Sequence, residues 1–247
     1  MNTPLSLQLF SVRKELEKNF EFTLRSLAEM GYTGVEFAGN YGGLAAEDLK
    51  KLLDELGLKV VGAHMGLDAL ENDFEANADY LAAIGCDHLI CPWADMNDAE
   101  SAAAIGKRLD AIAEKAAMRG FKFSYHNHGH EFKMTEEGEY LFDIMMDNCS
   151  ELVLAELDVC WVAMADADPV AAIRKYAGRA ELLHLKQLAV VDGKKQDVLF
   201  DKGMLDLKEI EAAAKLAGVT DFIVEEETPC EDMLDAVRVD IETVRKL

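Results

Sequence analysis

Short apolar runs alternate with longer segments of helical periodicity along the whole chain. Eight runs rich in branched and aromatic residues predict β-strands at residues 5–10, 33–37, 59–64, 88–91, 121–126, 152–158, 182–186 and 222–226. After them, apolar residues recur every three or four positions, which predicts helices at 20–29, 46–56, 74–84, 100–118, 140–147, 169–176, 207–216 and 232–246. Each predicted strand is followed by a predicted helix.

The glycines between these elements and the apolar character of the strands support a parallel sheet. Glycines that can end a helix in the left-handed conformation precede several strands, namely Gly31, Gly57, Gly120, Gly178 and Gly218. Strand segments such as VVGAH and LLHL are almost continuously apolar, as expected of parallel strands covered by helices. The sequence contains neither of the glycine-rich phosphate-binding motifs that are typical of open doubly wound sheets, GxGxxG and GxxxxGK(S/T). Eight units in 247 residues therefore predict one (β/α)₈ TIM barrel, a single domain spanning residues 1–247.

The net charge of the chain limits the classes of molecule that it is expected to bind. The chain carries 25 basic and 47 acidic side chains, a formal net charge of −22, which repels nucleic acid and anionic membranes. No apolar run approaches the roughly 20 residues of a spanning helix, and the first residues lack the zones of a signal peptide. The five cysteines show no CxxC spacing, so buried free thiols are the expectation. We expect a cytoplasmic protein that binds neither nucleic acid nor membranes.

The segment after the fifth predicted strand is rich in histidine. It reads YHNHGHE and holds three of the six histidines of the chain. Strand alternation puts Ser124, His126 and His128 on one side, and Glu131 can turn back over the barrel mouth. A polar loop is the simpler interpretation of one such histidine. Because barrel chemistry lies at the carboxyl ends of the strands, the cluster favours a functional site.

The sixth and seventh predicted strands also end in polar groups. Glu156 and Asp158 share one face of an otherwise apolar run, and buried acids are costly unless they are paired or metal-bound. Asp158 is alternatively a helix cap. His184 and Lys186 share a face of the next strand. A lone histidine there is usually a hydrogen-bonded core residue, but the neighbouring strands end in complementary groups.

The eighth predicted strand runs into three glutamates. Glu225 and Glu227 share a face, and at least one of the three is expected to reach the mouth rather than form a solvated charge run. Two carboxylates, an imidazole and one further oxygen or nitrogen donor suit a divalent ion of the series Mn²⁺, Mg²⁺, Co²⁺ or Zn²⁺. The pattern therefore predicts a divalent metal at the mouth.

Earlier strands supply weaker candidates for binding a substrate. Gln8, Glu36 and His64 lie at or near strand ends, where they can hydrogen-bond hydroxyl groups. Trp161 lies near a predicted mouth and can stack on the apolar face of a sugar, although a core role is an equal alternative.

Six segments, taken together and in order, carry a resemblance that spans nearly the whole chain. They are QLFSVR, GYTGVEFAG, YHNHGHEF, LDVCWVAMADADP, GRAELLHLKQ and FIVEEE. With them the chain resembles the sugar phosphate isomerase/epimerase family of the xylose isomerase-like TIM-barrel superfamily. The resemblance implies a metal held by an acid after strand five and by Asp158, His184 and Glu225. Many relatives carry glutamate where His126 stands, so Glu131 or His126 takes that place.

These features predict a metal-dependent isomerase or epimerase that acts on a small sugar or keto-sugar through an enediolate. The candidate catalytic groups are Glu225, Glu227, His126, His128 and Lys186. A metal-dependent lyase or dehydratase on a keto-sugar or inosose-like substrate is the first alternative, and a non-enzymatic sugar-binding protein is the second. The superfamily also includes DNA-repair endonucleases, which the negative charge argues against.

The expected partner is a small-molecule sugar, and the sequence also allows a homo-oligomer. No glycine-rich phosphate cradle follows strands seven and eight, and acidic residues dominate these loops. Lys186, Lys194, Lys195 or Lys202 is an alternative source of a local basic pocket. We expect an unphosphorylated substrate.

Overall fold

The eight predicted strands close into a parallel barrel in the computed structural model, which describes residues 1, 3–228 and 230–247. The barrel strands are β1 (Leu5–Gln8), β2 (Gly34–Phe37), β3 (Lys59–His64), β4 (His88–Cys91), β5 (Lys122–His126), β6 (Val153–Asp158), β7 (Ala180–Leu185) and β10 (Asp221–Val224). Their order around the barrel is β1-β10-β7-β6-β5-β4-β3-β2, with parallel pairing throughout. The predicted TIM barrel is confirmed.

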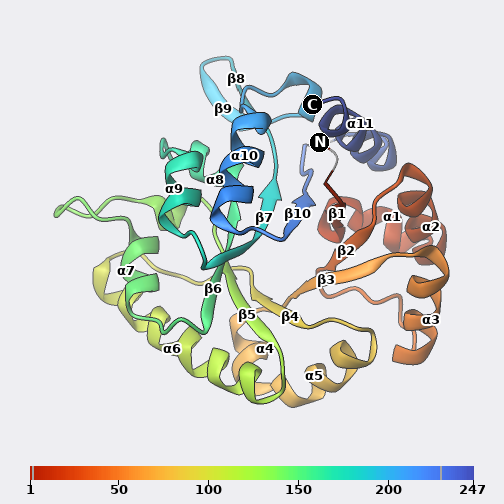
Figure 1. Cartoon of the computed structure of the whole chain (residues 1–247), viewed down its shortest axis with the longest axis horizontal. Helices are drawn as coiled ribbons and strands as arrows, with labels where there is room; N and C mark the ends of the chain where they lie inside the picture. Colours follow the sequence, from red (N-terminus) through yellow and green to blue (C-terminus); the bar gives the residue numbers. More distant parts are fainter. Residues whose placement is uncertain (2, 229) are drawn as a thin grey trace.

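Helices surround this barrel on all sides (Figure 1). They are α1 (Arg13–Lys18), α2 (Phe20–Met30), α3 (Ala46–Leu56), α4 (Leu67–Asn72), α5 (Phe74–Ala83), α6 (Ala99–Met118), α7 (Leu141–Asp147), α8 (Val159–Met164), α9 (Pro169–Lys175), α10 (Leu207–Ala217) and α11 (Met233–Arg245). Gly31 and Gly218 end α2 and α10 with φ of 95° and 92°, as predicted. Within the described ranges, none of these helices combines the length and apolar character needed to cross a membrane.

Besides the short helices α1, α4 and α8, which were not predicted, two regions differ from the predicted elements. The first strand ends at Gln8 rather than at residue 10, because a 3₁₀ turn (Leu9–Val12) begins there and the Gln8 side chain accepts the N–H of Phe10. A hairpin of β8 (Leu188–Val191) and β9 (Lys194–Asp197) follows β7 and was not predicted. Its two-residue turn has positive φ at both Asp192 and Gly193, which matches the right-handed twist of the strands.

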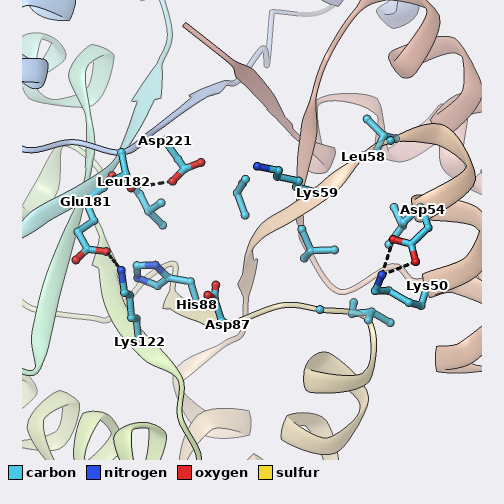
Figure 2. A pocket seen from close by; sticks show the side chains of 17 residues that line it. Lys50, Asp54, Leu58, Lys59, Asp87, His88, Lys122, Glu181, Leu182 and Asp221 are labelled. Atoms are coloured by element: carbon cyan, nitrogen blue, oxygen red, sulfur yellow. Dashed lines mark hydrogen bonds and ion pairs between the residues drawn. The ribbon is translucent and has the colours of Figure 1, made fainter.

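The barrel interior is divided by an apolar layer. Val61, Ile90, Leu182 and Ile223 pack together there as a cluster separate from the main hydrophobic core. Below this layer, at the amino ends of the strands, lies a cavity of about 490 Å³. Figure 2 shows ion pairs in its lining between Lys122 and Glu181 and between Lys50 and Asp54. The layer separates this cavity from the polar groups at the carboxyl ends.

A buried acid holds the 3₁₀ turn (Phe200–Lys202) that follows β9. Asp240 of α11 is fully buried, and its Oδ1 accepts the N–H of Phe200 at 3.0 Å. Burial, followed by the neighbouring carboxylate of Glu226, raises the pKa of Asp240 to about 8. The folded protein therefore keeps on Asp240 a proton that the unfolded chain loses near pH 4.

The stability contributed by this protonated form is fully present below about pH 4 and declines as the pH rises towards 8, by at most about 1.4 kcal/mol per pH unit. Asp240→Asn keeps an oxygen for the Phe200 amide and cannot ionise, so we expect it to flatten this decline. Urea denaturation at pH 5, 7 and 8.5 measures the effect. Asp235→Asn, on the exposed side of the same helix, is the control. Equal pH slopes for wild type and Asp240→Asn would contradict the assignment.

Candidate active site

A second cavity, of about 390 Å³, lies at the carboxyl ends of the barrel strands. Its polar lining consists of His64, His126, His128, Glu225 and Glu227. These side chains come from β3, β5 and the segments that follow β5 and β10. The sequence reasoning placed all five among its candidates, and the barrel brings them to one opening.

Four side chains with potential metal-ligand atoms converge beneath this cavity. His126, Asp158, His184 and Glu225 each offer a donor atom, all within 4.8 Å of one another, and all four are buried. The Nδ1 atom of His184 lies 3.2 Å from Oε2 of Glu225. Alternation along β5, β6 and β7 turns these polar side chains into the barrel, whereas intervening residues such as Tyr125 pack outwards against helices. We call these four side chains the mouth group.

Asp158 fills the helix-capping role that the sequence left as one alternative, and its second oxygen remains available for a metal ion. Its Oδ1 accepts the N–H of Trp161 at 2.9 Å and so caps α8. Its Oδ2 is buried and has no hydrogen-bond partner among the described residues. Burial raises the pKa of Asp158 to about 7, although the Lys186 ammonium opposes this shift. One oxygen is therefore structural and the other is free for a cation.

Glu131, the expected first ligand, lies outside the mouth group. Its Oε1 accepts the hydroxyl of Tyr125 at 2.8 Å, and its Oε2 accepts the backbone N–H of His128 at 2.8 Å. Because Tyr125 points away from the barrel axis, it draws this carboxylate away from the mouth. Geometry thus favours the alternative, His126.

Lys186 occupies a buried position among carboxylates. Its ammonium forms an ion pair with Glu227 and lies 3.5 Å from Asp197 and 3.8 Å from Glu225. Burial alone would lower the pKa of Lys186, but these carboxylates raise it above its ordinary value, so the group stays charged. Sequence reasoning missed Asp197 because it lies at the end of the unpredicted hairpin.

Two residues expected to bind substrate lie below the cavity. Gln8 is fully buried, donates to Oε1 of Glu36 at 2.6 Å, and accepts the N–H of Phe10. Glu36 is also fully buried, and its Oε1 lies 2.9 Å from Nε2 of His184. Both side chains are therefore positioned to orient the imidazole of His184 rather than to reach a sugar directly.

His64 and Glu156 complete this lower layer. The Nε2 atom of His64 lies 2.8 Å from Oε2 of Glu156 and 3.0 Å from Oε1 of Glu36. Burial lowers the pKa of His64, but the two carboxylates outweigh this effect and raise it to about 10. Sequence reasoning noted that Glu156 shares a face with Asp158 but gave it no role, although that shared face was the available signal.

Aromatic groups form one wall of the mouth. The ring of His128 lies 5.3 Å from that of Trp161, and Nζ of Lys186 lies 5.0 Å from the Trp161 ring. Burial and the nearby His126 lower the pKa of His128 to about 3, so its imidazole is neutral at physiological pH. Trp161 is not among the residues that line the cavity, so its stacking on a sugar stays a prediction.

Comparisons with known proteins place the chain in a family. A model of the xylose isomerase-like TIM barrel matches residues 24–247. A curated inosose dehydratase from Clostridium botulinum (strain Alaska E43 / Type E3) is 25% identical over 196 residues. The match covers 70% of this chain, but the chain spans only 64% of the length of that dehydratase.

Solved structures show the same architecture. A sugar phosphate isomerase/epimerase from Parabacteroides distasonis ATCC 8503 is 25% identical, with a TM-score of 0.85 and 98% of each chain covered. The IOLI protein, solved with a zinc atom, is 15% identical with a TM-score of 0.78, covering 99% of this chain and 97% of its own. The family model covers nearly the whole barrel, including every strand of the mouth group. The chain therefore belongs to the xylose isomerase-like TIM barrel family.

Proposed function

We propose that this protein is a divalent-metal-dependent isomerase or epimerase of a small sugar or keto-sugar. The observation that carries the proposal is the convergence of the buried mouth group, His126, Asp158, His184 and Glu225, beneath an open cavity. A structural relative carries the same class of activity in its name, and a barrel of the same fold holds a zinc atom.

The donor set fits a divalent cation. Two imidazoles and two carboxylates match the nitrogen and oxygen ligands of Zn²⁺, Mn²⁺ or Co²⁺. Burying Oδ2 of Asp158 without a partner is costly, and a cation would remove that cost. Although burial opposes it, the charges of Lys186 and His184 hold the pKa of Glu225 well below its ordinary value, so this ligand is anionic.

When bound, the ion would polarise a sugar carbonyl and its neighbouring hydroxyl and so acidify the carbon-bound proton. Glu227 borders the cavity and lies outside the mouth group, and it is the residue that would take that proton. Lys186 lies buried beside Glu227 and stays cationic, and its positive charge would favour negative charge on a substrate oxygen in the cavity. Neutral His128 can hydrogen-bond a hydroxyl group.

Incubation of metal-loaded protein with candidate keto-sugars in D₂O tests the reaction class. Deuterium incorporation without loss of mass supports isomerisation or epimerisation. Loss of water or of an aglycone supports the alternative, a lyase or dehydratase, which the inosose dehydratase relative favours. Both reactions begin with the same proton abstraction, so the products distinguish them.

The proposed substrate is unphosphorylated. The mouth carries Glu225 and Glu227, and Lys186 is already paired with Glu227, while Lys195 pairs with Asp166 at 2.5 Å. A phosphate dianion would therefore meet an unfavourable field. We expect a sugar to show a kcat/KM at least about tenfold above that of its phosphate ester at fixed ionic strength and metal concentration. A consistent preference for the esters would indicate a basic phosphate site and contradict this prediction.

A further inference from the structure

The middle of the three consecutive glutamates after β10 has no role in the proposed reaction, yet it is buried. Glu225 and Glu227 line the cavity, whereas Glu226 does not line it and is only 2% exposed. Burying a carboxylate is costly unless hydrogen bonds compensate for it. We propose that Glu226 and Asp240, called here the positioning pair, hold the backbone after β10 in place and thereby fix the carboxylate of Glu227.

Three contacts tie Glu226 to the rest of the fold. Its backbone N–H donates to Oγ of Ser11, in the 3₁₀ turn after β1, at 3.0 Å. Its Oε1 accepts the N–H of Thr228 at 2.6 Å. Its carboxyl group also forms a hydrogen bond with that of Asp240. Glu227 therefore lies between two residues whose backbone N–H groups are both hydrogen-bonded, so its direction is set from both sides.

Asp240 connects this segment to a second one at the mouth. Its Oδ1 accepts the N–H of Phe200 at 3.0 Å, in the 3₁₀ turn that follows β9. Asp197, the last residue of β9, lies 3.5 Å from Nζ of Lys186, and the same ammonium pairs with Glu227. One buried side chain of α11 thus holds both segments whose carboxylates meet at Lys186.

A single hydrogen joins the positioning pair. Two carboxylates in contact repel each other, whereas a carboxylic acid donates its hydrogen to a carboxylate in a short and strong hydrogen bond. Asp240 supplies this hydrogen because it keeps its proton in the folded protein. An amide can replace the donor at either position, since its N–H₂ group donates and its oxygen still accepts. Amide variants should therefore preserve the pair, and apolar variants should break it.

The support matters for Glu227 because its side chain has few contacts of its own. Lys186 is its one hydrogen-bond partner within the described ranges, and the side chain is 27% exposed. Glu225 is anchored differently, since its N–H donates to the carbonyl oxygen of Leu185 at 3.0 Å. Misplacing a reacting group by about 1 Å costs about 10²-fold in rate. Loss of the positioning pair should therefore impair proton abstraction and spare the metal ligand.

Glu226→Leu tests the pair, because it removes the partner of Asp240 and the acceptor of the Thr228 N–H. We expect kcat with the best keto-sugar to fall by about 30–100-fold, with KM within about twofold and metal content unchanged. Glu226→Gln keeps both contacts and should recover most of this loss. In a double-mutant cycle, adding Glu226→Leu to Glu227→Gln should lower kcat by less than about threefold further, because the pair acts through Glu227.

Amide hydrogen exchange measures the pair without any substrate. Peptides that span residues 222–228 should exchange faster in Glu226→Leu than in wild type. Asp143→Leu is the control, because it removes a carboxylate that accepts the Tyr176 hydroxyl at 2.6 Å, away from the mouth. This variant should keep wild-type kcat and wild-type exchange in residues 222–228. If Glu226→Leu does not fold, Ser11→Ala removes the acceptor of the Glu226 N–H and should change exchange and kcat in the same direction.

The proposal rests on the proposed function, since Glu227 is the proposed proton acceptor, and the two measurements separate their failures. Wild-type exchange in Glu226→Leu and Ser11→Ala overturns the positioning pair whether or not a sugar is turned over. Faster exchange with unchanged kcat, or a loss of kcat that adds fully to that of Glu227→Gln, also overturns it. Wild-type protein that turns over no keto-sugar contradicts the proposed function, and the exchange comparison then decides whether the pair holds this segment.

Discussion

Replacing Asp158 with asparagine is expected to lower metal affinity at the mouth group by at least about 100-fold and to abolish most turnover. The change keeps an oxygen that can accept the Trp161 N–H and so preserves the cap of α8. It removes the negative charge of the oxygen that has no partner among the described residues. Metal titration of chelator-treated protein, with circular dichroism to verify the fold, measures the effect. His184→Ala should show at least as large a loss.

Asp168→Asn is the matched control for this substitution. Asp168 caps α9 through the same kind of contact, accepting the N–H groups of Val170 and Ala171, and it lies outside the mouth group. We expect this variant to keep wild-type metal content and turnover. If Asp158→Asn and His184→Ala both retained full metal content, the mouth group would not be a metal site.

Glu227→Gln is expected to reduce kcat by about 10²–10⁴ while leaving metal content unchanged. The carboxylate borders the cavity but is not a member of the mouth group, so its loss removes the proton acceptor and not a ligand. Lys186 keeps Asp197 and Glu225 as nearby carboxylates, which limits structural damage. Steady-state kinetics with the best keto-sugar, together with metal analysis, provide the measurement.

Two further variants make this assignment specific. Glu227→Asp retains a carboxylate and should recover part of the lost kcat. Glu231→Gln alters an exposed glutamate four residues further along and should have no effect. A Glu227→Gln enzyme with wild-type kcat would exclude Glu227 as the proton acceptor and leave Glu225 or a histidine as candidates.

Local sequence patterns predicted the barrel because each β/α unit carries its own signal. Apolar runs predicted all eight barrel strands to within two residues at each boundary, and Gly31 and Gly218 ended helices where expected. The β8–β9 hairpin was missed although Asp192-Gly193 is a strong turn signal. β9 carries charged residues such as Lys194 and Lys195 and so lacks the apolar pattern of the barrel strands, whereas β8 is apolar throughout but pairs only with β9, outside the barrel.

Local sequence patterns predicted only part of the site, because some of its side chains are positioned by tertiary contacts. Period two put Asp158 on one face with Glu156 and His184 on one face with Lys186, whereas the resemblance to the family implied that Asp158, His184 and Glu225 are ligands. The choice between His126 and Glu131 depends on Tyr125, whose outward hydroxyl binds Glu131, and such a tertiary contact has no local signature. The closeness of His126 and Glu156 depends on the register of β5 against β6, in which these residues are direct partners.

Solvent deuterium incorporation into a keto-sugar, measured with one chelator-treated preparation before and after adding Mn²⁺ or Zn²⁺, tests the central claim most directly. If the mouth group holds a divalent ion needed for proton abstraction, exchange should be absent from the stripped protein and appear on metal addition. Asp158→Asn should remain inactive under both conditions. Exchange that proceeds equally fast in stripped and reloaded protein would contradict a metal-dependent reaction, and chelator-insensitive sugar binding without exchange would instead indicate a sugar-binding protein.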